Sequence, residues 1–414
     1  MKHAASSYLS FEKIALIAIV TIAFGTVIIG GISVSVTNHG RVVMGVQSDG
    51  ANLSGMTEAE VLQHFKNVEK NKLSRQAAVL QYNDRSWIIQ AADIQLHAEV
   101  EKAAKEAYVI GRTGSALQDI ASQMRCAIFG KNITLTGAYD PALLDIQLQK
   151  IKTDLDTQPV NATVALQANG AIKKTPAVTG LTLDTAPIKE SLDAKFKALK
   201  VTVRDSLQPD AQPPSVTNED IAAIDSVLGT YTTTFFPGAR GDNIGIAANH
   251  LQGALIRSQS SLSFNTIVGR RTRAAGYKNA GVIIDGEPAI DVGGGVCQVS
   301  STLYNAVLLA GMKPTARSSH FLPSHYVPAG RDATVADDLL DFVFQNPLPH
   351  PVYIVVSNTG TTLTINVLGT RADLGGQNIA LVTEGGSKRP SLYRIWSKDG
   401  KVINQEYLHT DNYS

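Results

Sequence analysis

Three glycines followed directly by a helical pattern restrict the possible folds of this 414-residue chain. The stretch from Asp291 to Gly311 reads DVGGGVCQVSSTLYNAVLLAG, so three consecutive glycines lead directly into a segment with helical periodicity. Cys297 lies where this helix is expected to begin, and free backbone N–H groups there favour a thiolate. One apolar stripe of the helix is expected to face a core; it consists of Val296, Val299, Leu303, Ala306, Val307 and Ala310.

A long uncharged segment near the N-terminus is the second constraint. The 23 residues from Ile14 to Val36 carry no charge, and at about 1.5 Å per residue a helix of this length crosses a hydrocarbon core of roughly 30 Å. A cleavable signal peptide is the alternative, but its apolar region is normally shorter and ends in a small-x-small site. We therefore predict an uncleaved signal-anchor over 14–36, with residues 1–13 in the cytoplasm and the remainder on the extracytoplasmic side of the cell membrane.

Composition limits the classes of partner. The chain has 37 basic and 36 acidic residues and a formal net charge of +1, which gives no electrostatic reason to expect nucleic acid. Its two cysteines, Cys126 and Cys297, are too few for a disulfide scaffold, and their spacing leaves open whether they pair. The expected partners are a lipid bilayer, through the N-terminal helix, and a ligand outside the membrane.

Mixed helix and strand patterns predict an α+β fold. Thr57 and Glu60 form a candidate capping box for a helix that continues to about Asn71, and a similar mixture of helix and strands recurs further along the chain. The proline-rich passage QPDAQPPSV is typical of a linker. We expect a transmembrane anchor (14–36), one or two small α+β modules (41–200), a linker (201–218), a mixed α+β domain (219–370) and a β-rich tail (371–414).

Two β-hairpins are predicted in the C-terminal part. Residues 351–369, PVYIVVSNTGTTLTINVLG, alternate between apolar and polar around an Asn-Thr-Gly turn. Arg394–Trp396 and Lys401–Tyr407 flank the turn dipeptide Asp399-Gly400.

Four blocks in the second half of the chain resemble the VanW family. They are SFNTIVGRRTRAAGY, GGGVCQVSSTLYNAVLLAG, HFLPSHYVPAGRDATV and FQNP, and they occur in this order between about Thr230 and Gly369. The family is named for a gene that accompanies vancomycin-resistance clusters in bacteria. The resemblance implies a bacterial envelope protein but supplies no reaction.

The region before these blocks resembles a YoaR-like peptidoglycan-binding domain that often precedes VanW domains. The resemblance rests on Gly45-Val46, on LSGMTEAEV from Leu53 to Val61 and on PAVTGLTLD from Pro176 to Asp184. Two copies fit between Gly45 and Lys200. It implies that peptidoglycan or its stem peptides are the partner, at the cell wall.

Cys297 is a candidate nucleophile, with His320 or His325 as its base and Asp332 as the orienting carboxylate. The order Cys297, His320, Asp332 is similar to that of transglutaminase-like cysteine hydrolases, although the separations of 23 and 12 residues are shorter. Such a triad would make a cysteine peptidase or transpeptidase that acts on cell-wall peptides. The alternative is a binding module in which Cys297 only packs at a crowded helix start, the histidines bind loop carbonyls and Arg331 pairs with Asp332.

Further residues are expected to contribute to binding. An oxyanion would be stabilised by the backbone N–H of Cys297, with Gln298 nearby. Asp338 is a second candidate for the carboxylate. No cofactor or metal is expected, because ligand spacings such as HExxH or CxxC do not occur. The candidate binding residues are Gln298, Ser301, Tyr304, Arg271, Tyr277, His325 and Arg331.

Overall fold

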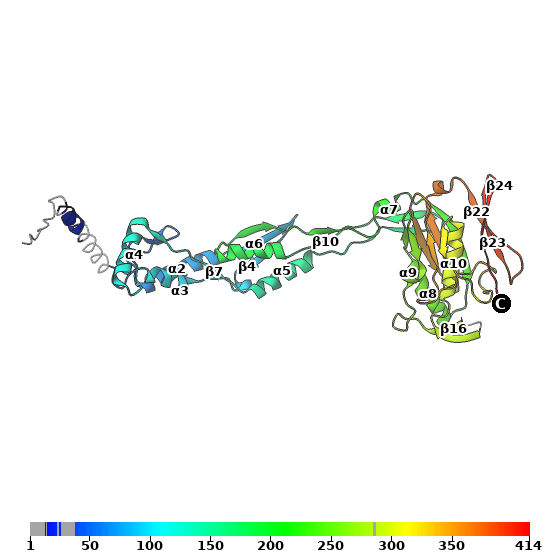
Figure 1. The fold of residues 1–414 in the computed structure, drawn as a ribbon, viewed down its shortest axis with the longest axis horizontal. Helices are drawn as coiled ribbons and strands as arrows, with labels where there is room; N and C mark the ends of the chain where they lie inside the picture. Colours follow the sequence, from blue (N-terminus) through cyan, green and yellow to red (C-terminus); the bar gives the residue numbers. More distant parts are fainter. Residues whose placement is uncertain (1–12, 14, 23–24, 26–37, 285–286) are drawn as a thin grey trace, which may run out of the picture. The chain divides into compact units, whose positions relative to one another are not determined.

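The computed structural model describes residues 13, 15–22, 25, 38–284 and 287–414 (Figure 1). They have a mixed α+β fold, as predicted, with several small sheets. Contacts divide the chain into two compact units: unit 1 comprises Met1–Thr157 and Leu181–Ala211, and unit 2 comprises Gln158–Gly180 and Gln212–Ser414.

Most of the predicted anchor over 14–36 lies outside the described residues, although residues 15–22 are helical. Among the residues that are described, no helix has the length and apolar character needed to cross a membrane. The anchor therefore rests on the sequence alone.

The first core of unit 1 is built around α2 (Glu58–Leu73). This helix begins at the predicted capping box, because the Thr57 side chain accepts from the Glu60 N–H and the Glu60 carboxylate accepts from the Thr57 N–H. Val61 and Phe65 of α2 are buried against α3 (Val100–Val109). The other elements of this part are β1 (Val46–Ser48), β2 (Ala51–Asn52), β6 (Lys131–Asn132) and α4 (Ala116–Phe129).

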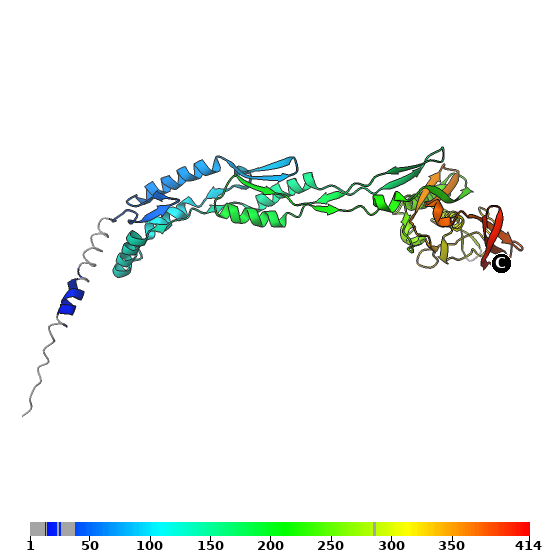
Figure 2. The ribbon, with the colours of Figure 1, turned by 90° about the horizontal axis from the view of Figure 1, so that it is seen from above.

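A second core of unit 1 joins α5 (Pro141–Leu155) and α6 (Ala186–Lys197) to a three-stranded sheet (Figure 2). The sheet consists of β3 (Gln76–Tyr82), β4 (Arg85–Gln90) and β11 (Val203–Ser206), and β11 runs parallel to β3. Thus residues 203–206 of the expected linker, 201–218, form a strand, and the prolines at 209, 213 and 214 lie after it. The short elements are η1 (Ala92–Ile94), β5 (His97–Ala98), β7 (Gly137–Ala138), β10 (Gly180–Thr182) and β12 (Asp210–Gln212).

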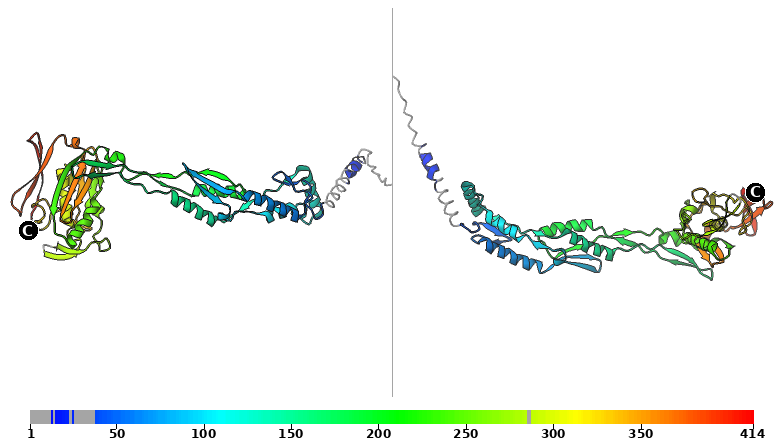
Figure 3. Two further views of the ribbon diagram at one scale, coloured as in Figure 1. Left: turned by 180° about the vertical axis from the view of Figure 1, so that it is seen from behind. Right: turned by 90° about the horizontal axis from the view of Figure 1, so that it is seen from below.

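Unit 2 is organised on a four-stranded antiparallel sheet in the order β13 (Ser226–Thr234), β21 (Thr362–Gly369), β20 (Val352–Asn358), β14 (Leu255–Ile256). The helices α8 (Ala239–Leu251) and α10 (Val296–Leu309) lie side by side and pack against this sheet (Figures 1 and 3). Gly229 of β13 allows α10 to approach closely, since a Cβ atom there would lie 2.4 Å from the Ala306 carbonyl oxygen.

The remaining strands of unit 2 form smaller sheets around this centre. The hairpin β8–β9 packs its Val164 with Tyr353 and Leu368 of the central sheet, which is why residues 158–180 belong to unit 2. Both predicted C-terminal hairpins are confirmed, as β20–β21 and as β23–β24. The elements not yet bounded are β8 (Thr163–Leu166), β9 (Ile172–Thr175), α7 (Asn218–Ala222), β15 (Ser261–Ser263), α9 (Phe264–Val268), β16 (Asn279–Ile284), β17 (Glu287–Val292), β18 (Lys313–Ala316), β19 (Val343–Gln345), η2 (Arg371–Leu374), β22 (Asn378–Glu384), β23 (Ser391–Lys398) and β24 (Lys401–Thr410).

Helix α10 is more deeply buried than its sequence pattern indicates. Every residue from Gln298 to Leu308 is buried, including the polar side chains. The periodicity predicts one core-facing stripe, but α10 packs on β13 and β21 and also contacts α8, β18 and β22. Because protein surrounds the helix, its polar residues must find hydrogen-bond partners inside the fold.

Candidate functional site

Cys297 is the second residue of α10 and keeps partial exposure to solvent. Gly295 precedes the helix with a φ of 109°, a conformation that favours glycine, and turns the chain into α10. The Cys297 thiol donates to the Val335 carbonyl oxygen at 3.4 Å. Cys126, the other cysteine, is buried in unit 1, and both are free thiols.

His320 lies on the loop after β18 and is fixed by Asp332. Its Nδ1 lies 2.5 Å from Asp332 Oδ2, and its backbone N–H donates to the same oxygen at 2.7 Å. The ring therefore leaves Nε2 free of the carboxylate, and the Tyr326 hydroxyl lies 3.4 Å from that nitrogen. His320 and Cys297 each shift the pKa of the other, so their side chains lie close together. The three residues of the predicted triad are thus brought together.

Asp332 is 1% exposed, so its charge requires internal partners. Oδ2 accepts the two bonds from His320, while Oδ1 accepts from Arg317 Nη2 at 3.1 Å and from the Tyr413 hydroxyl at 2.5 Å. Burial alone raises the pKa of this carboxyl, but the hydrogen bonds from His320 and Tyr413 and the charge of Arg317 bring it below its ordinary value. Asp332 is therefore a carboxylate at neutral pH.

The pKa shifts of Cys297 and His320 favour an ion pair of a thiolate and an imidazolium. Burial raises the pKa of Cys297, yet the hydrogen bond and charge of His320, a backbone hydrogen bond at Val335 and the charge of Arg271 lower it overall. Burial likewise lowers the pKa of His320, but hydrogen bonds to Asp332 and Cys297 raise it to about 9. A thiolate beside an imidazolium is the reactive form of a cysteine nucleophile.

Residues from the C-terminal segment complete the support of Asp332. Arg317, whose side chain is 8% exposed, binds Asp411 through Nη1 at 2.5 Å and Nη2 at 2.8 Å. Tyr413 accepts from the Gly330 N–H at 2.9 Å while it donates to Asp332. Burial raises the pKa of Tyr413 well above its ordinary value, as does its bond to Asp332, so the hydroxyl remains a donor.

Three predicted binding residues of α10 are buried and form hydrogen bonds within the fold. Gln298 is 2% exposed and donates to the Thr234 carbonyl oxygen at 2.8 Å, so its amide does not point to the thiol. Ser301 donates to the Cys297 carbonyl oxygen at 2.7 Å and accepts from the Ala333 N–H at 2.9 Å. The Tyr304 hydroxyl is 2.8 Å from His409 Nε2, inside the core.

The other predicted binding residues divide between the vicinity of Cys297 and more remote positions. Arg271 is paired with Asp337, and its charge acts on Cys297. Tyr277 is 2% exposed, and its hydroxyl has no partner among the described residues. His325 is exposed. Arg331 donates to the Leu381 carbonyl oxygen of β22, at 2.5 Å.

Two carboxylate alternatives are resolved by the geometry. Arg331 does not pair with Asp332, because Arg317 occupies that position. Asp338, the second candidate for the carboxylate, is exposed and binds Arg270 at 2.6 Å. The carboxylate at His320 is therefore Asp332.

Sequence reasoning missed Arg317, Tyr326, Asp411 and Tyr413. Tyr326 follows the candidate His325 directly, and its proximity to two histidines was an available signal. Asp411 and Tyr413 are about 80 residues from Asp332, and only the fold of the β22–β24 sheet brings them to it.

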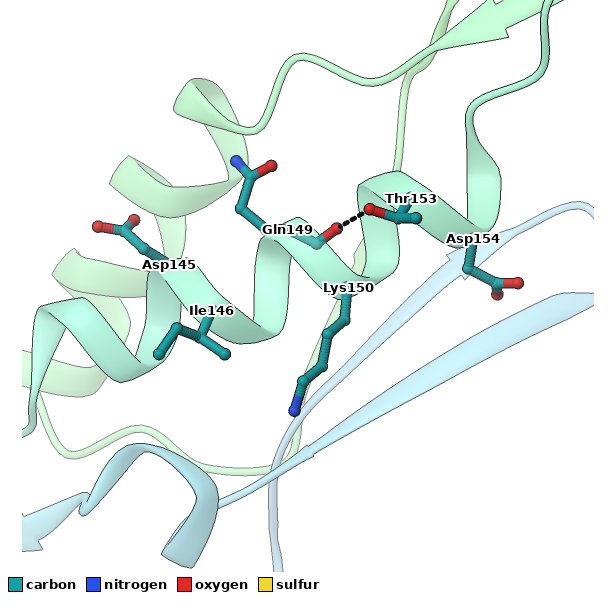
Figure 4. A pocket seen from close by; sticks show the side chains of 6 residues that line it. All are labelled: Asp145, Ile146, Gln149, Lys150, Thr153 and Asp154. Atoms are coloured by element: carbon teal, nitrogen blue, oxygen red, sulfur yellow. Dashed lines mark hydrogen bonds between the residues drawn. The ribbon is translucent and has the colours of Figure 1, made fainter.

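Unit 1 has a hollow on α5 of about 720 Å³, lined by Asp145, Ile146, Gln149, Lys150, Thr153 and Asp154 (Figure 4). Asp145 pairs with Lys189 at 2.6 Å, and Asp154 accepts from Arg85 and from Trp87 Nε1. Ile146 is 48% exposed and supplies apolar surface. All six lining residues belong to α5, and they include no nucleophile with a base.

The fold and the site together define an α+β protein with a cysteine, histidine and aspartate cluster at the start of a buried helix. Comparison with known families identifies its parts: residues 239–368 match the family described as "VanW like protein", and residues 87–204 match "Putative peptidoglycan binding domain". The chain therefore carries a VanW-like domain preceded by a domain of that second family, as the sequence blocks indicated.

Two curated relatives agree with this assignment. The chain is 42% identical over 157 residues to "Uncharacterized protein YoaR" of Bacillus subtilis, an alignment that covers 37% of this chain and 52% of that protein. It is 28% identical over 109 residues to "Vancomycin B-type resistance protein VanW" of Enterococcus faecalis, covering 25% of this chain and 40% of that protein. The matched region thus spans about half or less of each relative. No solved structure matches.

Proposed function

We propose that this protein is a cysteine-dependent hydrolase or acyl transferase of the cell envelope that acts on the peptides of peptidoglycan. The observation that carries the proposal is the arrangement of Cys297, His320 and Asp332, with the imidazole held at Nδ1 by a buried carboxylate. The raised pKa of His320, about 9, and the lowered pKa of Cys297 add support, since perturbed values of this kind gather at functional sites.

The chemistry follows from these positions. The Cys297 thiolate attacks the carbonyl carbon of an amide, forming a C–S bond, and the resulting oxyanion collapses with cleavage of the C–N bond. The His320 imidazolium gives its proton to the departing amine. Water or a second amine then attacks the thioester, His320 takes the proton of that nucleophile, and the thiolate leaves. Asp332 stabilises the imidazolium throughout.

The backbone N–H of Cys297 is the candidate oxyanion donor. The neighbouring N–H groups are used, since Val296 donates to the Gly293 carbonyl and Gln298 donates to the Gly295 carbonyl. Within the described part of the chain the Cys297 N–H has no acceptor. A free N–H beside the nucleophile suits the charge that develops on a tetrahedral intermediate. The Gln298 side chain is not a donor here, because it binds Thr234.

A second candidate function is recognition of peptidoglycan without chemistry. It is favoured by the family match over residues 87–204 and by the hollow on α5 within that range. The two functions are compatible, since a binding domain would hold a cell-wall enzyme at its substrate. We also propose that the uncharged segment 14–36 anchors the protein in the membrane with both units on the extracytoplasmic side.

The enzyme proposal is tested with Cys297→Ala and His320→Ala variants of the full chain. Purified sacculi are incubated with each protein, and released or newly linked peptides are identified by mass spectrometry. We expect products with the unsubstituted protein and none with either variant. If Cys297 also fails to react with a neutral thiol reagent at pH 7, the enzyme proposal is wrong.

Binding and location require separate measurements. Retention of the Cys297→Ala protein on sacculi tests recognition without turnover, and no retention would remove the peptidoglycan proposal. For the anchor, cell fractionation should find the protein in the membrane fraction. Protease added to intact spheroplasts should digest it, because both units would lie outside the membrane. Deletion of residues 14–36 should release it from the membrane fraction.

A further inference from the structure

Arg240 places a positive charge beside the cysteine site and pairs with no acidic residue that the structure describes. It is the second residue of α8 and is partly exposed. Three cations of the neighbouring segments are paired, since Arg270, Arg271 and Lys278 bind Asp338, Asp337 and Asp242 respectively. The exposed Arg273 donates to the Asn279 side chain instead. Among the described residues Arg240 forms no ion pair, and its guanidinium lies over the Tyr326 ring, 5.8 Å from the centroid.

Arg240 is held close to Cys297 by the glycine junction. A Cβ atom on Gly295 would lie 2.9 Å from both Cγ and the carbonyl oxygen of Arg240, so the arginine stem packs directly on this glycine. Gly295 is two residues before Cys297. The absence of a side chain at Gly295 therefore sets the distance between Arg240 and the start of α10.

Tyr326 connects the guanidinium to the histidine. The Arg240 guanidinium lies over the Tyr326 ring, and the Tyr326 hydroxyl lies 3.4 Å from His320 Nε2. The rings of Tyr326 and His320 meet edge to face at 6.3 Å between centroids. A cation fixed over an aromatic ring loses little freedom when it binds an anion, because its position is already restricted.

We propose that Arg240 binds a carboxylate of the substrate close to the acyl group that Cys297 attacks, so that the preferred substrates are acidic peptides. The planar guanidinium suits a carboxylate, which it can bind through two parallel N–H groups. This inference rests on the proposed cysteine chemistry, because it names the substrate class of the same site.

Alkylation of Cys297 measures the charge preference without knowledge of the natural substrate. Iodoacetate carries a carboxylate and iodoacetamide is its neutral counterpart; in both reactions the thiolate forms a C–S bond and iodide leaves. The ratio of the two rates, normalised to the same ratio for a small free thiol, reports attraction of a carboxylate. The experiment uses the full chain at pH 7, and a Cys297→Ser variant measures the background from Cys126.

The variants are Arg240→Gln and, as the matched control that also removes one positive charge, Arg270→Gln. Arg270 is suited to this role because it is exposed and already paired with Asp338. We expect Arg240→Gln to lower the iodoacetate-to-iodoacetamide ratio about tenfold, as for loss of a charged hydrogen bond, while Arg270→Gln leaves it unchanged. Arg240→Lys should retain part of the preference.

The outcomes separate this inference from the proposed function. A reactive Cys297 whose ratio is the same in the unsubstituted protein and in Arg240→Gln would overturn the carboxylate site and leave the cysteine chemistry standing. An equal fall in both Arg240→Gln and Arg270→Gln would also overturn it, because the effect would then come from net charge. A thiol that reacts with neither reagent would overturn the proposed function itself.

Discussion

The hydroxyl of Tyr413 donates to Asp332 Oδ1 at 2.5 Å across 81 residues of sequence. Tyr413 lies beyond the VanW-like match, which ends at residue 368. The carboxylate that orients His320 is thus held from two directions: the imidazole and backbone of His320 bind one oxygen, and Arg317 and Tyr413 bind the other. The C-terminal segment therefore helps to position the candidate site.

Substitution Tyr413→Phe should destabilise the fold and weaken the site. Removal of one donor from a buried carboxylate is expected to cost about 1.5–3 kcal/mol in the free energy of unfolding, measured with urea. The matched control is Tyr407→Phe, because Tyr407 is 57% exposed and its hydroxyl donates only to Thr410. That variant should change stability by less than about 0.5 kcal/mol. Equal effects of the two substitutions would contradict a special role for the Tyr413 hydroxyl.

Substitution Asp332→Asn should lower the reactivity of Cys297 at pH 7. Without the carboxylate the pKa of His320 falls, so the imidazolium that stabilises the thiolate is lost. One unit of pKa corresponds to about a tenfold change in the population of the charged form, and we expect at least that fall in the rate of alkylation by iodoacetamide. Asp338→Asn serves as the control, since Asp338 is an exposed partner of Arg270. A larger fall in the alkylation rate with Asp338→Asn than with Asp332→Asn would contradict the assignment of Asp332 as the carboxylate that orients His320.

The titration of His320 should depend on Cys297. In the unsubstituted protein the imidazole pKa is expected at about 9, because hydrogen bonds to Asp332 and Cys297 and their charges outweigh burial. In Cys297→Ala two of these contributions disappear, so the pKa measured by NMR of the ring protons should fall. An unchanged titration would show that the two side chains do not interact.

The free energy of unfolding should also depend on the pH-dependent charges of Cys297 and His320. The raised pKa of His320 makes its protonation stabilising; this contribution is complete below about 6.5, the ordinary value, and is lost as the pH rises through about 9. The lowered pKa of Cys297 acts in the opposite direction, since its contribution is lost as the pH falls through that lowered value. Because these two contributions change in opposite directions over the same range, they offset each other, and the unfolding free energy of the unsubstituted protein measured in urea should vary little between pH 7 and about 9. A steep fall over this range would contradict the pairing of the two side chains.

Substitution Gly295→Ala should lower the free energy of unfolding more than the same substitution at a glycine that has a positive φ but no close neighbour. Gly360 is the control: its φ is 87°, and a Cβ there meets no atom within 4 Å, so only the backbone penalty of about 1–2 kcal/mol applies. At Gly295 the Cβ also contacts Arg240, which adds about 1–3 kcal/mol for overpacking. Unfolding in urea measures both variants, and equal costs would contradict the close packing of Arg240 on this glycine.

Local signals in the sequence predicted one helix start and two hairpins, because each of these depends on residues that are close together in the chain. Thr57 and Glu60 specify a helix start because both hydrogen bonds form within one turn. The turn residues of 351–369 and Asp399-Gly400 specify hairpins for the same reason. By contrast, the apolar stripe of α10 did not reveal that Ser301 and Tyr304 are also buried, because the strands that cover them come from distant segments.

The residues of the candidate triad are recognisable in the sequence: a cysteine after three glycines, a histidine and an aspartate in the order of a cysteine hydrolase, within blocks typical of one family. Which histidine and which carboxylate meet depends on the fold, as does the presence of Arg240, Arg317, Tyr326 and Tyr413 around them. A buried charge must be paired, and the groups that pair it are chosen by proximity in space. Such proximity leaves no periodic or local pattern in the chain.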